Sequence, residues 1–394
     1  MTEIATPATS GFFATLLSAQ PLPALAARLG AWGAALWGRP IRIGSRVIVA
    51  RHSQVLELLD RDVDFRIAPI NADRIEAVNG PFILGMDRCA VLASERKALY
   101  GALARVPLAE IEAAVAQEAA ARVAAANSEI DVVGAYARPI AAHTARSLFG
   151  IAGSDEQAFM EVARAIFAHT FLNLTNDKAI ENRARIAADY MRVWFVAEIA
   201  KRRASGNLGT DMMGRLLADR ILDDDGVRRT LGGMLVGSID TTASSVAKIV
   251  WTIGKNRVLA EGIAADVNDS ARLAGWCREA LRLWPHNPLV QRQAVASTRF
   301  ADIDIRPGDQ MIAWTQAAMH DASAFPEPDI LRPDRPAGAY LHFGGGLHPC
   351  AGRAVNAFQI PLLVAALVKR GIKSVGPMQW AGPFPDHLIL KFER

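Results

Sequence analysis

A glycine-rich segment around one cysteine, His342–Arg353, constrains this chain more than any other part of its sequence. The three glycines Gly344–Gly346 have no Cβ, so their backbone can adopt left-handed dihedral angles and approach a flat ligand closely. They lead to Cys350, which stands just before a predicted helix, and a helix N-terminus stabilises a thiolate through its dipole and free N–H groups. These residues alone leave three interpretations of Cys350 open: a nucleophile, a metal ligand or a buried structural cysteine.

The composition excludes several classes of protein. The 394 residues are 51% hydrophobic and 21% charged, which excludes a disordered tail protein, a collagen-like fibre and a disulfide-stabilised scaffold. A chain of this length can bury a large core and enclose a cofactor. Cys89 and Cys277 complete a set of three cysteines that is too sparse for a CxxC metal site. The net charge of +4 suits an acidic protein partner as well as nucleic acid.

The apolar stretch Gly11–Trp37 bears on location. Gln20, Pro21, Pro23 and Arg28 interrupt it, so it lacks the ~20 uninterrupted apolar residues that span a bilayer. No basic region precedes it, which argues against a signal peptide. The few cysteines fit a reducing compartment. We therefore predict a cytoplasmic protein without a membrane segment.

The periodicity of the sequence predicts a mainly α fold with a small β part. A helix spanning Gly226–Asn256 would be about 45 Å long and would cross a whole domain. The other predicted elements are listed in chain order: a helix over Leu22–Leu36, a β-hairpin over Ile41–Ala50 turning at Gly44-Ser45, a short helix over Gln54–Leu59, an irregular loop over Arg66–Arg88, mostly helix over Ala93–Ser205 with breaks near Gly153 and Asn173–Asp177, a helix over Ala271–Leu283, strands over Leu289–Ile312 and a final helix over Asn356–Lys369.

Two helical segments carry unusual side chains. Gly237–Thr242 places a Gly, a Ser and two Thr in mid-helix, where Gly costs roughly 1 kcal/mol and a Thr hydroxyl can bond the carbonyl four residues earlier. Such a segment fits a tight helix crossing or a notch beside a ligand. Glu279 and Arg282 stand three residues apart on one helix face, and their apolar neighbours predict a buried ion pair.

The pattern Phe-Gly-x-Gly-x-His-x-Cys-x-Gly, from Phe343 to Gly352, resembles the haem-binding loop of the cytochrome P450 family at every specified position. Glu279-x-x-Arg282, upstream of Cys350, matches the same family. The resemblance covers residues from about 40 to 394. It implies a single cytochrome P450 domain over 1–394, with the β-containing regions near 40–65 and 289–312 and the haem-ligand loop at 342–353.

The resemblance also assigns the residues around a haem b (heme b, iron protoporphyrin IX). Cys350 would be the axial thiolate ligand of the iron, with Phe343 shielding it from water. Gly346 and Gly352 would let the loop and the helix pack against the porphyrin. His348, Arg292 and Arg96 would bind the haem propionates, although Leu92 replaces the histidine usually found one turn before Arg96. Glu279 and Arg282 would support the cysteine loop.

The resemblance implies a haem-thiolate monooxygenase that inserts one oxygen atom of dioxygen into an apolar small molecule by hydroxylation or epoxidation. Thr241 would stabilise bound dioxygen and Asp240 would supply protons, while Ser238 departs from the usual glycine. A terpenoid, a small aromatic molecule or a macrocycle would each be compatible. The predicted substrate-cavity residues are Ile70, Phe82, Ile83, Phe167, Phe171, Val236 and Leu289.

Electrons must arrive from elsewhere, because the chain carries no flavin or iron–sulfur fingerprint. We expect a separate ferredoxin or flavodoxin with an NAD(P)H-dependent reductase, and no nucleic acid partner. Cations around Arg353, Lys369 and Arg370 would suit an acidic donor, and they also fit ordinary solvated surface charge. Two alternatives remain, a peroxide-driven haem-thiolate enzyme and a non-catalytic haem-thiolate ligand sensor; the intact Asp240-Thr241 pair argues against both.

Overall fold

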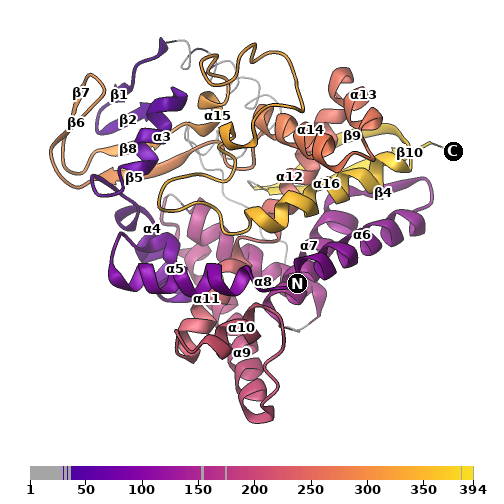
Figure 1. Ribbon diagram of the computed structural model, residues 1–394, viewed down its shortest axis with the longest axis horizontal. Coiled ribbons are helices and arrows are strands. Elements are labelled where there is room, and N and C mark those ends of the chain that lie inside the picture. The colour runs from indigo at the N-terminus through magenta and orange to yellow at the C-terminus, as the bar shows by residue number, and fades with distance from the viewer. Residues whose placement is uncertain are drawn as a thin grey trace.

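The structure is a computed structural model that describes residues 30, 33, 37–151, 155–173, 175–382 and 384–393. The helix predicted over Leu22–Leu36 lies almost wholly outside these residues. The predicted fold class is confirmed: the described chain is mainly α with a small β part (Figure 1). None of its helices has both the length and the apolar character needed to cross a lipid bilayer.

The helices make up most of the molecule. In chain order the α-helices are α3 His52–Asp60, α4 Ala68–Asn79, α5 Ala90–Leu103, α6 Leu108–Ala125, α7 Arg138–Phe149, α8 Glu156–Phe167, α9 Lys178–Ser205, α10 Met212–Asp219, α11 Asp224–Val236, α12 Asp240–Ile253, α13 Arg257–Ala265, α14 Ser270–Leu283, α15 Thr315–Ala318 and α16 Arg353–Lys369. Two π-helical turns, η2 Val132–Ala137 and η3 Ala168–Leu172, and two 3₁₀ turns, η1 Ile83–Gly85 and η4 Ala337–Ala339, join them.

The strands form a five-stranded sheet, a three-stranded sheet and a hairpin. The first has the order β1-β2-β8-β5-β3 and the second β4-β10-β9, at opposite sides of the view in Figure 1. Their bounds are β1 Ile41–Ile43, β2 Arg46–Val49, β3 Phe65–Arg66, β4 Glu129–Asp131, β5 Val290–Ala294, β6 Thr298–Phe300, β7 Ile303–Ile305, β8 Gln310–Ala313, β9 Ile372–Ala381 and β10 Phe384–Phe392. The predicted hairpin over 41–50 is confirmed, with Gly44 at a φ of +60° in its turn.

The segment 66–88 is not the irregular loop that the sequence predicts. It contains α4 and η1. Pro69 lies in the first turn of α4, where a helix needs no N–H donor and proline is therefore tolerated. Gly80 then ends the helix at a φ of +79°. Proline and glycine usually interrupt regular structure, so this segment is predicted as a loop, but here Pro69 and Gly80 mark the two ends of a helix.

The long helix predicted over Gly226–Asn256 is also wrong as a single element. The segment forms α11 and α12, with a break at 237–239. The Thr241 hydroxyl donates to the Gly237 carbonyl at 2.6 Å, and the Ser238 hydroxyl donates to the Leu235 carbonyl at 2.8 Å. Side-chain hydroxyl groups thus donate hydrogen bonds to the backbone carbonyls around the break. Asp223 caps the start of α11, accepting from the Gly226 N–H at 2.7 Å, as its position in the sequence predicts.

One large hydrophobic core joins the helices, and it includes side chains from Ile75 to Phe392. Helix α12 lies inside this core and is buried on nearly every side, although it carries Asp240, Lys248 and several hydroxyl side chains. A second cluster lies between α3 and the five-stranded sheet. The residues that flank the break between α11 and α12, among them Leu235, Val236 and Ile239, are buried in the large core, which fixes the position of the break.

Candidate haem and substrate site

Cys350 lies in the loop that leads into α16. Its backbone N–H donates to the Phe343 carbonyl at 2.8 Å, and its side chain is accessible from a cavity. Burial raises the pKa of the Cys350 thiol, while hydrogen bonds from the N–H groups of Gly352 and Arg353 lower it in part. The loop therefore presents one sulfur atom to the cavity and provides N–H groups that stabilise its anionic form.

The glycines of this loop have different neighbours. Gly344 and Gly346 have φ angles of +65° and +63°. A Cβ on Gly346 would lie 1.9 Å from the Leu59 carbonyl oxygen of α3, so this glycine allows the loop to touch α3, and Gly346 does not line the cavity. Its expected role in letting the loop pack against a haem stays a prediction. Gly352 does line the cavity, and a Cβ there would make an ordinary contact, 3.7 Å from the Cys350 sulfur.

The cavity has a volume of about 380 Å³ and reaches from the Cys350 loop to the break between α11 and α12. Six of the seven predicted substrate-cavity residues line it: Ile70, Phe82, Ile83, Phe167, Phe171 and Leu289. Val236 does not; it lines a much smaller neighbouring pocket with Ile75 and Val78. On the last turn of α11 it is Gly233, Met234 and Gly237 that face the cavity, and Val236 projects from a neighbouring face.

Thr241 and Asp240 lie on different sides of α12. Thr241 lines the cavity. Asp240 does not, and its side chain is buried in an ion-pair cluster, 2.8 Å from Nη2 of Arg164 and 3.1 Å from Nε of Arg138. Arg164 also pairs with Asp386 at 2.6 Å. Consecutive residues of a helix point about 100° apart. The side chains of Asp240 and Thr241 therefore face different surroundings although the two residues are neighbours in the sequence.

A group of cationic side chains lies beside the Cys350 loop. Arg292 is buried, and the only hydrogen bond of its side chain among the described residues is from Nη1 to the Gln291 carbonyl, at 2.8 Å. Burial lowers the pKa of Arg292 to about 10. Burial, together with Arg292 and Arg96, lowers the pKa of His348 to about 4, and Nδ1 of His348 has no partner within the described part of the chain. The carboxylates that act on Arg292, Asp62 and Asp87, form their ion pairs with other arginines, Arg88 and Arg66.

Arg96 takes a supporting position in this cluster. It does not line the cavity; its Nη1 donates to the Leu347 carbonyl, and its guanidinium lies 5.2 Å from the centre of the Tyr100 ring. Leu92, in place of the expected histidine, is buried in the core. The structure thus brings Arg96 to the Cys350 loop, although its bond there is to the backbone.

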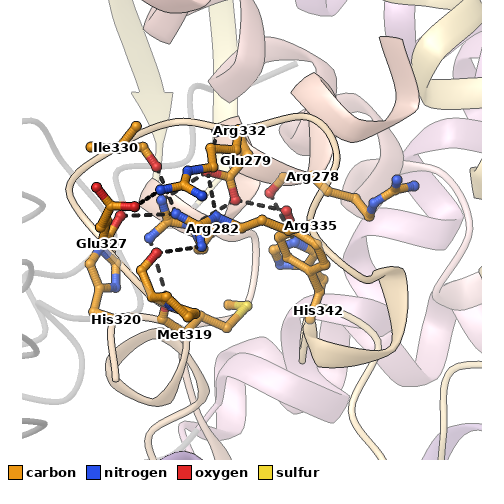
Figure 2. A network of polar contacts seen from close by, with 12 residues as sticks. Arg278, Glu279, Arg282, Met319, His320, Glu327, Ile330, Arg332, Arg335 and His342 are labelled. Carbon is orange, nitrogen blue, oxygen red and sulfur yellow. Dashed lines mark hydrogen bonds and ion pairs between the residues drawn. The ribbon is translucent and has the colours of Figure 1, made fainter. Parts of the chain in front are cut away.

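Glu279 and Arg282 form a fully buried bidentate pair with N···O distances of 2.8 and 2.9 Å. The Tyr340 hydroxyl donates to Glu279 at 2.7 Å, and the Arg332 backbone N–H donates at 3.1 Å. Figure 2 shows this network with a further member, Arg335, whose Nε lies 3.5 Å from the Glu279 carboxylate. Because Tyr340 lies two residues before the glycine-rich segment, the buried pair anchors the start of that segment.

Arg335 is the member of this network that the sequence does not reveal. Its guanidinium donates to the carbonyls of Pro326, Glu327 and Ile330 at 2.8 to 2.9 Å. A proline-rich segment without regular structure needs donors for its carbonyls, which is the one signal in the sequence for an internal arginine. That signal does not distinguish Arg335 from Arg332.

A model of the family described as cytochrome P450 matches residues 156–370, more than half of the chain. The chain belongs to the cytochrome P450 family. It is 23% identical over 248 residues to Cytochrome P450 109 of Bacillus spizizenii, covering 61% of this chain and 60% of the relative. It is 23% identical over 261 residues to the mycinamicin IV hydroxylase/epoxidase of Micromonospora griseorubida, covering 65% and 63%. The chain thus spans less than two thirds of the length of these curated P450 relatives.

Solved P450 structures share the fold over nearly the whole chain. The structure of CYP109Q5 from Chondromyces apiculatus has a TM-score of 0.78 at 17% identity and covers 95% of this chain and 97% of its own. Open P450 EryK from S. erythraea has a TM-score of 0.77 at 22% identity, covering 93% and 96%. At such identities the likeness concerns the fold alone.

Haem b is the cofactor of the family, and the residues around the cavity fit it. The glycine-rich loop offers a single accessible sulfur with N–H groups directed at it. The buried Arg292, which forms no ion pair among the described residues, lies beside it with Nδ1 of His348, which has no hydrogen-bond partner among them. A carboxylate-bearing cofactor would supply Arg292 with an ion-pair partner. The side chains of this chain therefore fit both the iron and the propionates of a haem.

Proposed function

We propose that this chain is a haem-thiolate monooxygenase that inserts one oxygen atom of dioxygen into an apolar small molecule. One observation carries the proposal: a single cavity has the Cys350 sulfur on one wall and Thr241, beside a helix break, on another. A thiolate-bound haem supplies the activation of dioxygen and the oxygen-atom transfer when it is present. Relatives named as a cyclooctat-9-en-7-ol 5-monooxygenase and a hydroxylase/epoxidase support this reaction class.

In this proposal the chain's own residues hold the cofactor. Cys350 ligates the iron, and the N–H groups of Gly352 and Arg353 stabilise its thiolate. Phe343 lies next to it in the loop and limits water access, and Arg292 and His348 pair with the propionates while Arg96 holds the loop. Glu279 and Arg282 keep the loop's starting point fixed through Tyr340.

Thr241 and Asp240 handle protons in the proposed reaction. The Thr241 hydroxyl donates its hydrogen to the Gly237 carbonyl, with an O···O distance of 2.6 Å. Its oxygen can therefore accept a hydrogen bond from a donor in the cavity. Arg164 and Arg138 both bind Oδ1 of Asp240, so a proton enters this carboxyl group at Oδ2 or displaces one of the two guanidinium groups.

The substrate occupies the apolar part of the cavity, against Ile70, Phe82, Phe167, Phe171 and Leu289. The electron donor is a separate ferredoxin or flavodoxin served by an NAD(P)H-dependent reductase, and the reaction takes place in the cytoplasm. Fractionation of cells that express the protein would test its location.

Replacing the proposed ligand tests the central assignment. Cys350→Ser removes the thiolate, so the reduced carbon monoxide complex loses the absorption band characteristic of thiolate ligation. The wild-type protein, supplied with a ferredoxin, its reductase, NAD(P)H and dioxygen, should consume NAD(P)H in the presence of a bound substrate and form an oxygenated product. Absorption spectra and mass spectrometry measure the two effects.

Cys89→Ser is the matched control. Cys89 is exposed, and its sulfur accepts from the Leu92 N–H at 3.4 Å as the cap of α5, a task serine performs well. This variant keeps the wild-type spectrum. A thiolate-type spectrum in Cys350→Ser would overturn the ligand assignment. Turnover with peroxide alone would support the peroxide-driven alternative, and substrate binding without any product would support the ligand sensor.

A further inference from the structure

Arg74 brings a guanidinium group to the wall of the cavity, at a position that the family motifs do not cover. It lies in α4 and lines the cavity together with Ile70 and Asn71. Its Nη2 donates to the Ile70 carbonyl at 2.6 Å and its Nη1 donates to the Asn173 carbonyl at 3.2 Å. These bonds tie α4 to the end of η3. A guanidinium has five N–H donors, so three of them remain for a ligand.

No carboxylate neutralises this guanidinium within the described part of the chain. Arg74 forms no ion pair there, and the residues that line the cavity include neither Asp nor Glu. Burial lowers the pKa of Arg74, and the exposed neighbour Asp73 offsets this only in part. An arginine nevertheless stays protonated in proteins. The cavity therefore contains a fixed positive charge that needs an anion.

The cofactor does not account for this charge. The other arginine of the cavity wall, Arg292, lies on β5 and within electrostatic range of His348 in the Cys350 loop. Arg74 is instead fixed at the junction of α4 and η3, where it donates to the carbonyls of Ile70 and Asn173. Arg292 is therefore available for the cofactor, and Arg74 remains for another ligand.

Other charged side chains lie close to Arg74 but outside the cavity wall. Lys178 and Arg185, on α9, pair with the same carboxylate, Glu181, with N···O distances of 2.8 Å each, and Asp73 is exposed beside Arg74. None of these four residues lines the cavity. On the side of the cavity formed by α4 and η3, the charge that a ligand meets is therefore that of Arg74.

We propose that Arg74 binds the carboxylate of the substrate, and that the substrate class is an amphipathic carboxylic acid whose apolar body extends along the aromatic wall toward Thr241. The planar guanidinium fork matches a carboxylate in a bidentate geometry. Phe82, Phe167 and Phe171 supply the apolar surface for the rest of the molecule. This inference rests on the proposed function and adds to it a charge on the substrate and an orientation.

Matched acids and esters test the proposal with the haem-loaded protein. The probes are hexanoate, decanoate, tetradecanoate and 2-naphthoate, each compared with its own methyl ester. Equilibrium dissociation constants come from calorimetry and from substrate-induced shifts of the haem absorption band. We expect at least one acid to bind the wild-type protein roughly 10- to 100-fold more tightly than its ester, the ratio given by a hydrogen-bonded charge.

Two variants of Arg74 and one control complete the test. Arg74→Gln removes the charge and should bring the acid to the affinity of its ester, while Arg74→Lys should retain part of the preference. Arg185→Gln is the matched control, because Arg185 also reaches α4, donating to the Ala77 carbonyl at 3.3 Å, without lining the cavity. Its preference for acids should equal that of the wild type.

The proposal fails if no acid binds better than its ester, or if Arg74→Gln keeps the preference. It also fails if Arg74→Gln and Arg74→Lys only lower the melting temperature, which would make Arg74 a structural tie between α4 and η3. In each case an intact thiolate-type carbon monoxide spectrum of the wild-type protein would leave the proposed monooxygenase function standing. Loss of that spectrum would instead overturn the function.

Discussion

Lys248 carries an ammonium group in the middle of α12, enclosed by protein. Its Nζ donates to the Pro285 carbonyl at 2.8 Å and lies 5.3 Å from the centre of the Trp284 ring. Burial lowers the pKa of Lys248 to about 7, from 10.5 for a free side chain. The neighbouring His286 is uncharged at neutral pH, because burial and Lys248 lower its pKa to about 3. The folded state therefore accommodates the protonated lysine only at a cost.

Lys248→Met should reveal that cost as a pH dependence. Between pH 7 and pH 10.5 the unfolded chain keeps the Lys248 proton while the folded protein releases it, so the wild-type protein gains stability as pH rises. The unfolding free energy of the wild type, minus that of Lys248→Met, should rise by roughly 3 to 4 kcal/mol between pH 7 and pH 10. Urea unfolding of the haem-loaded proteins at a series of pH values measures it.

Lys255→Met serves as the control for this measurement, because Lys255 is exposed just beyond the end of α12. Its difference from the wild type should stay constant over the same pH range. A constant difference for Lys248→Met as well would mean that the ammonium group is fully compensated by the Pro285 carbonyl and the Trp284 ring.

At the scale of elements, the break between α11 and α12 is the feature that shapes the cavity. Gly237, Ser238, Thr241 and Thr242 all line the cavity there. Thr242 also connects the two walls, since its hydroxyl lies 3.1 Å from Oδ1 of Asn356 in α16, the helix that follows Cys350. The break is therefore held by hydroxyl groups within the helix and by one contact across to the cysteine side.

The Thr241→Ala variant should still bind haem, but less of the NAD(P)H that it consumes should lead to oxygenated product. The hydroxyl at the break orders the proposed proton donor, and positioned proton transfer contributes ~10²- to 10⁴-fold to a step that needs it. We expect product formed per NAD(P)H to fall roughly tenfold or more, with hydrogen peroxide accounting for the difference. Assays of product, peroxide and NAD(P)H in one reaction measure this partition.

Thr252→Ala is a close control for Thr241→Ala. Thr252 makes the same type of bond four residues back on the same helix, to the Lys248 carbonyl at 2.7 Å, and it does not line the cavity. It should leave the yield of product per NAD(P)H unchanged. Equal peroxide yields from both variants would point to a general loosening of α12 and would count against a role for the Thr241 hydroxyl in proton transfer.

The errors in the predicted elements have physical causes. The spacing of apolar residues predicted one helix over 226–256, because periodicity continues across a break made by side-chain hydroxyls. Pro69 and Gly80 predicted a loop, because only the tertiary context shows that they stand at the two ends of α4. The cysteine loop was predictable since its glycines and cysteine are local requirements. Arg335 and Arg74 were not, because their partners are backbone carbonyls that the sequence does not mark.

At the scale of the whole molecule, distant segments of the chain complete each other's sheets. β2 pairs in parallel with β8, with Val47 opposite Met311, and β10 pairs with β4, with Leu390 opposite Ile130. The sequence could not reveal β4, β9 and β10 as one sheet, because strand pairing at such separations leaves no local pattern. This arrangement favours a single domain over 1–394, which remains a prediction.

Deleting residues 384–394 tests that prediction. The deletion removes β10, whose Leu388, Leu390 and Phe392 are buried in the main core. It also exposes the pairing edges of β4 and β9 and opens the core under α12. In a single cooperative domain the loss of this strand unfolds the whole chain, so we expect no haem incorporation and no cooperative thermal transition. A protein lacking only residues 393–394 is the control and should retain both. A truncated chain that still binds haem and melts cooperatively would mean that the three-stranded sheet folds independently of the haem-binding body.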